Sequence, residues 1–474
     1  MLLGSPADRE RLSGAHGAQL SSPMPPTRTK PSAVVSLVHL GCARNLIDSE
    51  LILGRLADQG LVVSGDPAAA DTIVLNTCSF IGPAREESER NIKELVKRKK
   101  RGEIERVVVA GCLVQRFQHQ LEKRFPGVDL FAEISDGAEL AKAIKALSLG
   151  ESVPRYLSNG GLREPSRDAS RLLSTPKSFA YLRISHGCDH TCSFCAIPAI
   201  RGKHRSKRPD DVLSEARELI DAGVKELVIV AEDSTAWGRD MGLELPDLVE
   251  PLADLPGDHK IRVMYAYPNR FPWKLTRLLR EHPRVAPYLD IPVQHIATPV
   301  LRAMRRAGSG DQVRATLDRL REEVPNITLR TTLLVGFPGE TDADAAELVE
   351  FVKQYKIGRL GAFTYSPEEG TSGFELENDV PAKVARARHK AVLAARDSVL
   401  RDSQGALVGE TLEVLIDEAA SKAHPIALGR TLMDAPEVDL IVRVEKCKAA
   451  VGARVKAEIL GLDEESNLVA RVVK

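Results

Sequence analysis

The first block of the chain alternates short apolar runs with longer segments in which charged residues recur at helical spacing. It extends from residue 33 to about residue 150. Apolar runs of this length are typical of buried parallel strands, and the charged segments are typical of helices that cover them. The block therefore predicts an α/β domain with a parallel sheet. Its clearest strands are predicted at 34–40, 71–76 and 106–111, and its clearest helix at 85–100.

A second and longer block of the same kind begins after residue 177. Six apolar runs are separated by helical segments, for example 210–223 and 342–355, and a long helix over 381–403 ends the series. Six βα units in series favour a partial (βα)6 barrel over a doubly wound sheet. The six strands are predicted at 179–185, 226–232, 260–267, 288–294, 328–336 and 359–366.

The pattern changes again after residue 405, where short strands between turns replace the helices. Five such strands in fewer than 70 residues predict a small antiparallel β-barrel. These strands are predicted at 411–418, 425–431, 438–445, 454–463 and 467–473.

Two stretches lack any apolar period. Residues 1–32 are predicted to be a disordered leader, and residues 151–177, rich in Ser, Gly, Pro and Arg, are predicted to be a linker. The domains are therefore predicted at 33–150, 178–405 and 406–474.

Charge and hydropathy restrict the class of protein. The 474 residues contain 66 Lys and Arg and 66 Asp and Glu, so the zero net charge excludes a grossly basic nucleic-acid coat but not a local basic patch. No apolar run reaches the roughly 18 residues of a membrane span, and the first 30 residues lack the apolar core of a secretory signal. We therefore expect a cytoplasmic protein without a membrane partner. In that reducing compartment, clustered cysteines are more often metal ligands or catalytic groups than disulfides.

Three of the seven cysteines form one close cluster in the sequence. Cys188, Cys192 and Cys195 follow a predicted strand with the spacing C-x3-C-x2-C. Three thiolates at this spacing can bind three corners of a cubane iron–sulfur cluster, which leaves one iron open for a substrate. The alternative is a structural zinc loop, which needs a fourth ligand such as His186 or His190. The spacing is not that of paired C-x2-C knuckles, and it favours the cluster.

Three further cysteines each lie just past the carboxyl end of a predicted parallel strand. The carboxyl ends of parallel strands meet at one edge of an open sheet. A lone cysteine there is most often an inert buried thiol, but three in the same placement predict a second three-cysteine site. These three are Cys42, Cys78 and Cys112, whereas Cys447 stands outside both sets and is predicted to be structural.

The residues around both sets resemble a known family. CDHTCSFC (188–195) and the AIPAIRGKHRSK that follows it (196–207) resemble the radical S-adenosylmethionine (SAM) superfamily. LGCARNLIDSE (40–50), NTCSFIGPAREES (76–88) and AGCLVQR (110–116) resemble the N-terminal domain of the radical SAM methylthiotransferases. The resemblance covers essentially residues 33–474, and it implies that domain, a radical SAM core and a C-terminal barrel called TRAM, in this order.

The resemblance implies two 4Fe–4S clusters and SAM as cofactors. One cluster would cleave SAM to a 5′-deoxyadenosyl radical, and the other would handle the sulfur that is inserted into an unactivated C–H bond. The resemblance also implies that Phe194, just before the third cysteine, lies near the adenine, although a packing aromatic is an equal alternative. The partners implied are an electron donor such as flavodoxin or ferredoxin and a sulfur donor that the sequence does not identify.

Further candidate residues lie at the ends of core strands, and none is predicted to be catalytic beyond the cluster ligands. Gly336 and Gly339 would line the SAM site, or form a plain turn with Thr341 as the helix N-cap. Gln294 and Glu232 are predicted to face the barrel mouth as cofactor-binding residues, or to be solvated loop residues. The basic stretch 201–208 could neutralise a carboxylate of SAM or of the substrate, or be a solvated charge run.

Two branches of the family differ in substrate. One modifies an adenosine of tRNA, and the other modifies an aspartate of small-subunit ribosomal protein S-twelve. Residues 407–474 contain nine Lys and Arg against twelve Asp and Glu, and an acidic barrel suits a basic protein better than RNA. The run GRTLMDAPEVDL (429–440) resembles the ribosomal-protein branch, except that Leu440 stands where the family usually has Gly. We expect methylthiolation at the β-carbon of that aspartate; the alternatives are the tRNA reaction and a non-catalytic, zinc-stabilised adaptor of translation.

Overall fold

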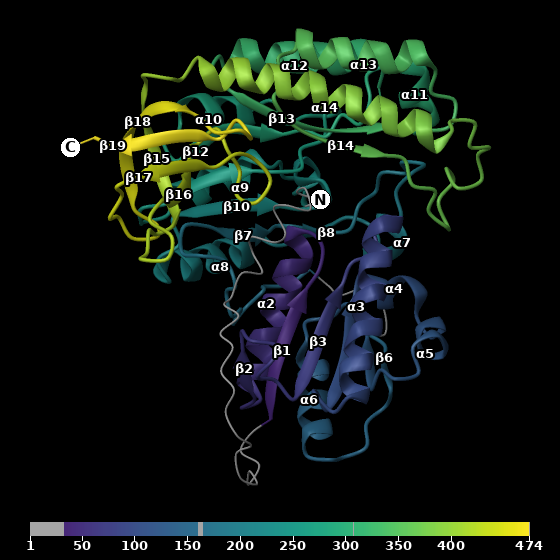
Figure 1. Ribbon diagram of the computed structural model, residues 1–474. Helices are drawn as coiled ribbons and strands as arrows, with labels where there is room; N and C mark the ends of the chain where they lie inside the picture. Colours follow the sequence, from purple (N-terminus) through teal and green to yellow (C-terminus); the bar gives the residue numbers. More distant parts are fainter. Residues whose placement is uncertain (1–32, 160–164, 307, 474) are drawn as a thin grey trace. The chain divides into compact units, whose positions relative to one another are not determined.

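The computed structural model describes residues 33–159, 165–306 and 308–473. The predicted leader 1–32 lies outside the described residues. The chain forms two compact units, one holding most residues up to Leu172 and the other most residues from Leu173 on (Figure 1).

The first unit is built on a parallel sheet of six strands in the order β2-β1-β3-β4-β5-β6, which confirms the parallel α/β prediction. Three of its strands have only two or three residues, and no period reveals a strand that short. One of these, β6, lies in the stretch predicted to be a linker. The strands are β1 Val34–His39, β2 Val62–Ser64, β3 Thr72–Thr77, β4 Arg106–Gly111, β5 Leu130–Ala132 and β6 Tyr156–Leu157.

Helices cover both faces of this sheet. Alternate residues of β3 point into two separate cores, Val74 into one and Ile73 and Leu75 into the other, which explains why three consecutive residues of the strand are apolar. Helices α2 (Ala43–Asp58) and α6 (Ala138–Ser148) close the first core. The second core is closed by α3 Gly82–Lys100, α4 Cys112–Phe117 and α5 Gln120–Arg124. The strand order reverses between β1 and β3, and such a switch point is where open sheets of this order bind ligands.

The second unit begins with six parallel strands in sequential order, β7-β10-β11-β12-β13-β14. This order confirms the predicted (βα)6 series, and the sheet stays open because β7 and β14 are its two edges. The strands are β7 Ala180–Arg183, β10 Glu226–Val230, β11 Lys260–Val263, β12 Val285–Asp290, β13 Thr328–Val335 and β14 Arg359–Thr364.

Helices of the second unit pack against this sheet around one large apolar core (Figure 1). The main ones are α8 Pro209–Asp221, α9 Pro246–Asp254, α10 Leu275–Glu281, α12 Gly310–Glu323, α13 Asp342–Gln354 and α14 Ala382–Gly405. Shorter elements lie at the carboxyl ends of the strands: the β8–β9 hairpin (Ser185–His186 with Arg205–Ser206), α7 Ile197–Arg201 and α11 Thr298–Ala303.

The C-terminal strands close into a five-stranded barrel in the order β15-β16-β17-β19-β18. The barrel was predicted as antiparallel, and all neighbouring pairs are antiparallel except β17 and β19, which are parallel. Cys447 lies buried in the barrel core, consistent with its predicted structural role. The strands are β15 Thr411–Glu418, β16 Ala427–Arg430, β17 Val442–Glu445, β18 Arg454–Leu462 and β19 Leu468–Val472.

Between β16 and β17 runs a segment, 431–441, that we call the closing segment. Part of it, 438–441, was predicted as strand, and this prediction is wrong because its side chains contact the core sheet instead of a barrel neighbour. Asp434 accepts from Arg359 at 2.8 Å, and Glu437 accepts from the Tyr181 hydroxyl at 2.7 Å.

Asp439 completes this contact. It accepts from the Tyr288 hydroxyl at 2.6 Å and from Arg330 at 3.2 Å, and Arg330 also donates to Asp290 at 2.9 Å. The core partners of the closing segment come from β7, β12, β13 and β14, near the amino ends of most of these strands. The closing segment therefore covers the end of the sheet opposite the one that carries active sites in such barrels.

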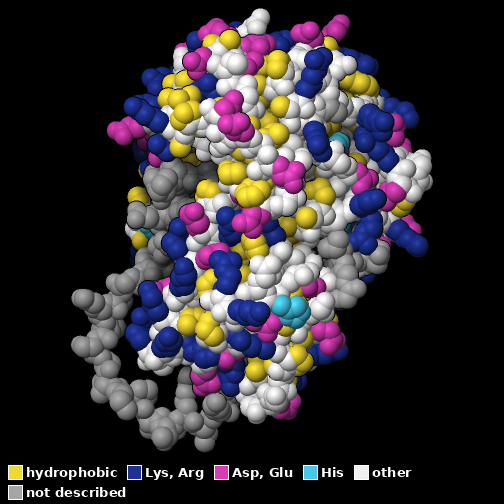
Figure 2. Space-filling model, turned by 90° about the vertical axis from the view of Figure 1, so that its right-hand side faces the viewer, with side chains coloured by type: hydrophobic (Ala, Val, Ile, Leu, Met, Phe, Trp, Pro, Cys, Tyr) yellow, Lys and Arg dark blue, Asp and Glu magenta, His cyan; other side chains and the backbone are white. Residues whose placement is uncertain are grey.

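The closing segment also changes how the acidic excess of residues 407–474 should be interpreted. Three acidic groups of 407–474, Asp434, Glu437 and Asp439, face the core. One basic group of the same range, Arg430, also faces the core, where it pairs with Glu226. The electrostatic argument for a basic partner therefore rests on fewer outward acidic groups than the sequence count suggests. Figure 2 presents the side of the second unit that faces away from β15–β19, and Lys, Arg, Asp and Glu side chains are interspersed there.

Candidate metal centre

Cys188, Cys192 and Cys195, the loop triplet, lie between β8 and α7, past the carboxyl end of β7. The backbone folds the loop back on itself: the Cys188 amide donates to the Gly202 carbonyl at 3.0 Å, and the Cys195 amide donates to the Cys192 carbonyl at 3.1 Å. Gly187 makes the approach possible, because its φ is +75° and a Cβ there would lie 2.5 Å from the Gly202 carbonyl oxygen.

The electrostatics show that the loop triplet forms one group. Burial raises the pKa of Cys188 to about 12, with further contributions from Asp233 and Cys192. Burial also raises the pKa of Cys195 to about 12, and Cys192 and Cys188 raise it further. Each thiol thus disfavours a thiolate at its neighbour, which is the situation that a bound cationic centre relieves, since metal ligands must be deprotonated. The donor set fits three ligands of an iron–sulfur cluster.

A single-ion site is less well supported. Among the residues that the structure describes, no three His, Cys, Asp or Glu side chains converge closely enough to hold one metal ion. A cubane is several atoms across and does not require its ligands to meet at one point. The zinc alternative needs a fourth ligand, and the Nε2 atom of His190 already pairs with Asp233 at 2.8 Å.

An aromatic side chain from the loop that follows β11 holds the loop triplet in place. The His190 ring stacks on Tyr267 with a centroid distance of 3.7 Å and an interplanar angle of 11°. The Arg306 guanidinium lies 3.9 Å from the centroid of the same ring, and its Nη1 lies 3.6 Å from the Cys192 sulfur. Neither Tyr267 nor Arg306 was predicted as a site residue. Tyr267 was assigned to the predicted strand 260–267, whereas β11 ends at Val263 and Tyr267 lies in the loop that follows. No local pattern singles out Arg306.

Cys42, Cys78 and Cys112, the sheet triplet, follow β1, β3 and β4, three adjacent strands of the first unit. The register pairs Thr77 with Gly111, so Cys78 and Cys112 are the next residues on two neighbouring strands. Gly41, before Cys42, is close to Cys78: a Cβ at Gly41 would lie 2.9 Å from the Cys78 Cβ. The topology therefore brings together three cysteines that are far apart in sequence.

Two side chains hold the strand ends beneath the sheet triplet. Asn45 of α2 donates to the carbonyls of Leu40 and Thr77, at 2.7 Å and 3.2 Å, and so ties β1 to β3. Ser88 of α3 donates to the Cys78 carbonyl at 2.8 Å. The cysteines are therefore placed by a rigid frame at the switch point of the sheet.

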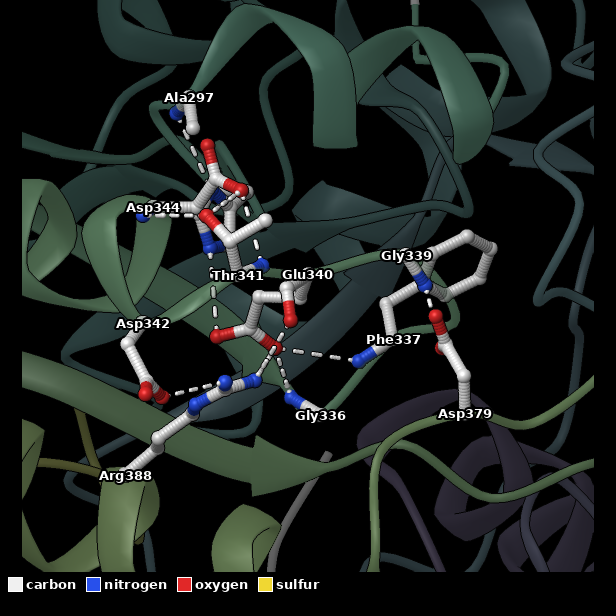
Figure 3. Close-up of polar contacts among 11 residues, drawn as sticks. Ala297, Gly336, Phe337, Gly339, Glu340, Thr341, Asp342, Asp344, Asp379 and Arg388 are labelled. Carbon is white, nitrogen blue, oxygen red and sulfur yellow. Dashed lines mark hydrogen bonds and ion pairs between the residues drawn. The ribbon is translucent and has the colours of Figure 1, made fainter.

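The turn after β13 carries the two candidate glycines and is organised by Glu340 (Figure 3). The buried Glu340 carboxylate accepts from the amides of Gly336 and Phe337, and Arg388 lies 3.6 Å from it. The Nε2 atom of His295 lies 3.8 Å from the other carboxylate oxygen. Glu340 was not among the predicted site residues, although its place directly after a Gly-x-x-Gly turn is a signal that the sequence shows.

The two glycines have different surroundings. Gly336 has φ +75°, and a Cβ there would lie 2.5 Å from the Ala385 Cβ of α14, so packing against this helix requires glycine. Gly339 has φ +82° with open space around it, and its amide donates to Asp379 at 2.7 Å. The next helix begins with the predicted N-cap, because Thr341 and Asp344 form a capping box.

The remaining candidates lie near the same end of the sheet. Phe194 packs with Phe337 in a small apolar cluster, which links the cysteine loop to the turn after β13. Gln294 has φ +70° and is half-buried; its backbone accepts from Leu334 at 2.7 Å. Glu232 is half-buried and close enough to Cys188 to raise its pKa, after the larger effect of burial.

The basic stretch 201–208 is neither one charged surface nor a solvated run. Lys207 is fully buried and pairs with Glu215 at 2.6 Å, so it supports the fold and is not accessible to a substrate. Arg201 is also buried, whereas Lys203 and Arg208 are exposed. The members that burial does not exclude, above all the exposed Lys203 and Arg208, remain candidates for a substrate carboxylate.

Comparison with family models places the chain in a class. Residues 182–352 match the radical SAM superfamily, residues 34–133 match the uncharacterized protein family UPF0004, and residues 408–473 match the TRAM domain. The fold is shared with a solved radical SAM methyltransferase, TsrM from Kitasatospora setae, at a TM-score of 0.52 and 17% identity over 73% of this chain and 78% of that one. The chain is therefore a radical SAM protein, a class whose cofactors are an iron–sulfur cluster and SAM.

Relatives define the family within that class. The chain is 39% identical to the ribosomal protein uS12 methylthiotransferase RimO of Trichlorobacter lovleyi over 93% of this chain and 98% of that one. It is 40% identical to the protein of the same name from Myxococcus xanthus over 92% and 91%. The chain belongs to the RimO family. Among its described helices, none is long and apolar enough to cross a membrane.

Proposed function

We propose that this protein is a methylthiotransferase that inserts a methylthio group at the β-carbon of an aspartate in ribosomal protein uS12. The observation that carries the proposal is the presence of two cysteine triplets, each at the carboxyl ends of a parallel sheet, in a chain of the RimO family. A β-methylene C–H bond is far too weak an acid for a side-chain base at neutral pH. Radical chemistry supplied by a cofactor is therefore required.

The two triplets have separate roles in this proposal. The loop triplet holds a 4Fe–4S cluster, and the sheet triplet holds a second one that handles sulfur. When bound, a cluster with three thiolate ligands offers an open iron to the amino and carboxylate groups of SAM and supplies the electron for its cleavage. An electron donor such as flavodoxin or ferredoxin and a separate sulfur donor complete the system, which we place in the cytoplasm.

The protein's own residues bind and orient SAM. Phe194 lies in the same apolar cluster as Phe337, which supports a place for the adenine beside this turn. Glu340 and Asp379 accept from the amides of this turn and fix its shape, while Gly339 stays exposed, so we place the SAM site beside the turn. Gln294 and Glu232 complete the proposed cofactor-binding set. For the substrate carboxylate, the exposed cations Lys203 and Arg208 are the remaining candidates of the basic stretch.

The domain bounds are part of the proposal. We assign residues 33–150 to the sulfur-handling domain, 178–405 to the radical SAM core and 406–474 to the TRAM barrel. The family matches at 34–133, 182–352 and 408–473 lie within these bounds.

A substrate comparison tests the proposal. The anaerobically reconstituted protein is incubated with SAM, a reductant and a sulfide source, with purified uS12 and total tRNA offered in parallel. Mass spectrometry should find a methylthio group on an aspartate of uS12 and none on adenosine. Modification of tRNA alone would assign the protein to the branch of the family that modifies an adenosine of tRNA. A protein that holds only zinc after strictly anoxic expression would instead be a non-catalytic adaptor.

A further inference from the structure

We propose that Arg306 sets the reduction potential of the cluster held by the loop triplet, and that Tyr267 holds Arg306 in place for this role. The inference rests on the proposed function, because it requires a cluster on Cys188, Cys192 and Cys195. It concerns one charge whose Nη1 atom lies 3.6 Å from the Cys192 sulfur.

Three contacts fix the Arg306 guanidinium. Nη1 lies beside the Cys192 sulfur, Nη2 donates to the Pro292 carbonyl, and the guanidinium carbon lies 3.9 Å from the centroid of the Tyr267 ring. Tyr267 itself is 4% exposed, so it is a fixed support. A cation over the face of an aromatic ring is attracted by the ring quadrupole, more strongly where water is excluded.

The same ring also holds the cysteine loop. His190 lies between Cys188 and Cys192 in sequence and stacks on Tyr267 at 3.7 Å. The His190 ring and the Arg306 guanidinium lie at similar distances from the centroid of the Tyr267 ring and cannot both occupy one face of it. The Tyr267 ring therefore lies between them. Asp233 pairs with His190 at 2.8 Å and anchors this stack to the end of β10. One aromatic ring therefore fixes the distance between the loop and the guanidinium.

A fixed cation beside a cluster ligand favours the reduced cluster. Reduction adds a negative charge to the cluster, and iron–sulfur potentials respond to net charge and to hydrogen bonds at the sulfurs. Burial weakens the screening of the interaction.

The test is a redox titration of the full-length protein monitored by electron paramagnetic resonance, without SAM. All variants carry Ala at the three positions of the sheet triplet, so that one cluster titrates. Arg306→Gln should lower the midpoint enough to reduce the ratio of reduced to oxidised cluster at least tenfold at a fixed potential, a shift of about 59 mV for one electron. Arg306→Lys should have a midpoint potential close to that of the parent protein, because lysine keeps the positive charge.

Two further variants complete the design. Tyr267→Leu keeps the arginine but removes its support, and should lower the midpoint by less than Arg306→Gln does. Arg302→Gln is the matched control, since Arg302 is an exposed arginine on the preceding α11, and it should leave the midpoint unchanged. If Arg306→Gln does not retain iron, the midpoint of Tyr267→Leu tests the inference instead: a lowered midpoint supports it, and an unchanged midpoint contradicts it.

The outcomes separate this inference from the proposed function. A parent protein that binds no cluster on the loop triplet would contradict the proposed function itself. A parent that binds one, with an Arg306→Gln midpoint equal to that of the parent at equal iron content, would overturn only the inference. A variant that loses SAM affinity without any shift of the midpoint would also overturn it, and would make Arg306 a SAM-binding residue.

Discussion

The loop triplet and the sheet triplet bring three thiols together by different routes. The loop triplet spans eight consecutive residues, and a loop with one glycine hinge brings its thiols together. The sheet triplet spans three strands, and only the parallel register of β1, β3 and β4 makes its members neighbours. A local loop can assemble its ligands without the complete fold, whereas the sheet triplet exists only once the sheet has formed. The two sites should therefore respond differently to damage.

Removal of each triplet should have the largest effects. Replacing the loop triplet with alanine should abolish cleavage of SAM to 5′-deoxyadenosine. Replacing the sheet triplet should leave that cleavage intact and abolish methylthiolation, because radical formation needs only the open iron of the first cluster. Chromatography of 5′-deoxyadenosine, mass spectrometry of uS12 and iron analysis give the three readouts. Continued methylthiolation by the sheet-triplet variant would refute the division of roles.

A smaller effect should follow when the frame of the sheet triplet is changed without touching a cysteine. Gly111 has φ +94°, and a Cβ there would lie 2.9 Å from the Thr77 carbonyl oxygen and closer still to Asn76. Gly111→Ala should destabilise the first unit by about 4 kcal/mol through strain and overlap, and should deplete only the iron bound by the sheet triplet.

Gly60→Ala is the matched control for this prediction. Gly60 has φ +77° with nothing near its hypothetical Cβ, so the substitution should cost only about 1 kcal/mol. Thermal melting followed by circular dichroism, together with iron analysis, checks both variants. Equal losses in the two would show that close packing at Gly111 does not position the sheet triplet.

The loop triplet should be insensitive to damage at the opposite end of its sheet. Asp439→Asn removes a carboxylate that accepts from Tyr288 and Arg330. It should destabilise the second unit by about 3 kcal/mol, because Arg330 is left with Asp290 as its remaining charge partner. Both tryptophans, Trp237 and Trp273, lie in this unit, so urea unfolding followed by their fluorescence reports on it. A parallel loss of iron from the loop triplet would show that the two ends are coupled.

The smallest effect is expected at the cysteine outside both triplets. Cys447→Ala shortens one side chain in the core of the C-terminal barrel and should cost about 1 kcal/mol. Iron content and SAM cleavage should equal those of the parent protein. A loss of iron would show that the Cys447 thiol is a metal ligand and would contradict its assignment as a structural cysteine.

Periodicity predicted the architecture because the longer strands of both sheets contain consecutive apolar residues and are separated by segments with helical spacing. It missed β2, β5 and β6, since two or three residues carry no period. It also assigned 438–441 to a strand, because the apolar residues Val438, Leu440 and Ile441 surround Asp439, and the sequence does not show that the partners of Asp439 lie in the core sheet.

The candidate site divides in the same way. The cysteines were recognised because their spacing, or their placement after strands, is visible in sequence. Arg306 and Tyr267 lie far from the loop triplet in sequence, and only the closure of the βα series brings them to Cys192 and His190. The role of Lys207 was also mispredicted. Its partner Glu215 lies in the next helix, α8, and the sequence does not show that both side chains are buried.

The closing segment has a consequence for anyone who exchanges or deletes domains in this family. Arg330 and Arg359, both nearly buried, depend on acidic groups that belong to the C-terminal barrel. A protein truncated before residue 406 would leave these guanidinium groups without those counter-ions, and loss of activity would then report a damaged core and not a lost docking module. A chimera that takes its barrel from a relative must carry an Asp, Glu and Asp that meet the recipient's own arginines and tyrosines. The barrel and the core are thus separate in sequence, but they can be inherited or engineered only as a matched pair.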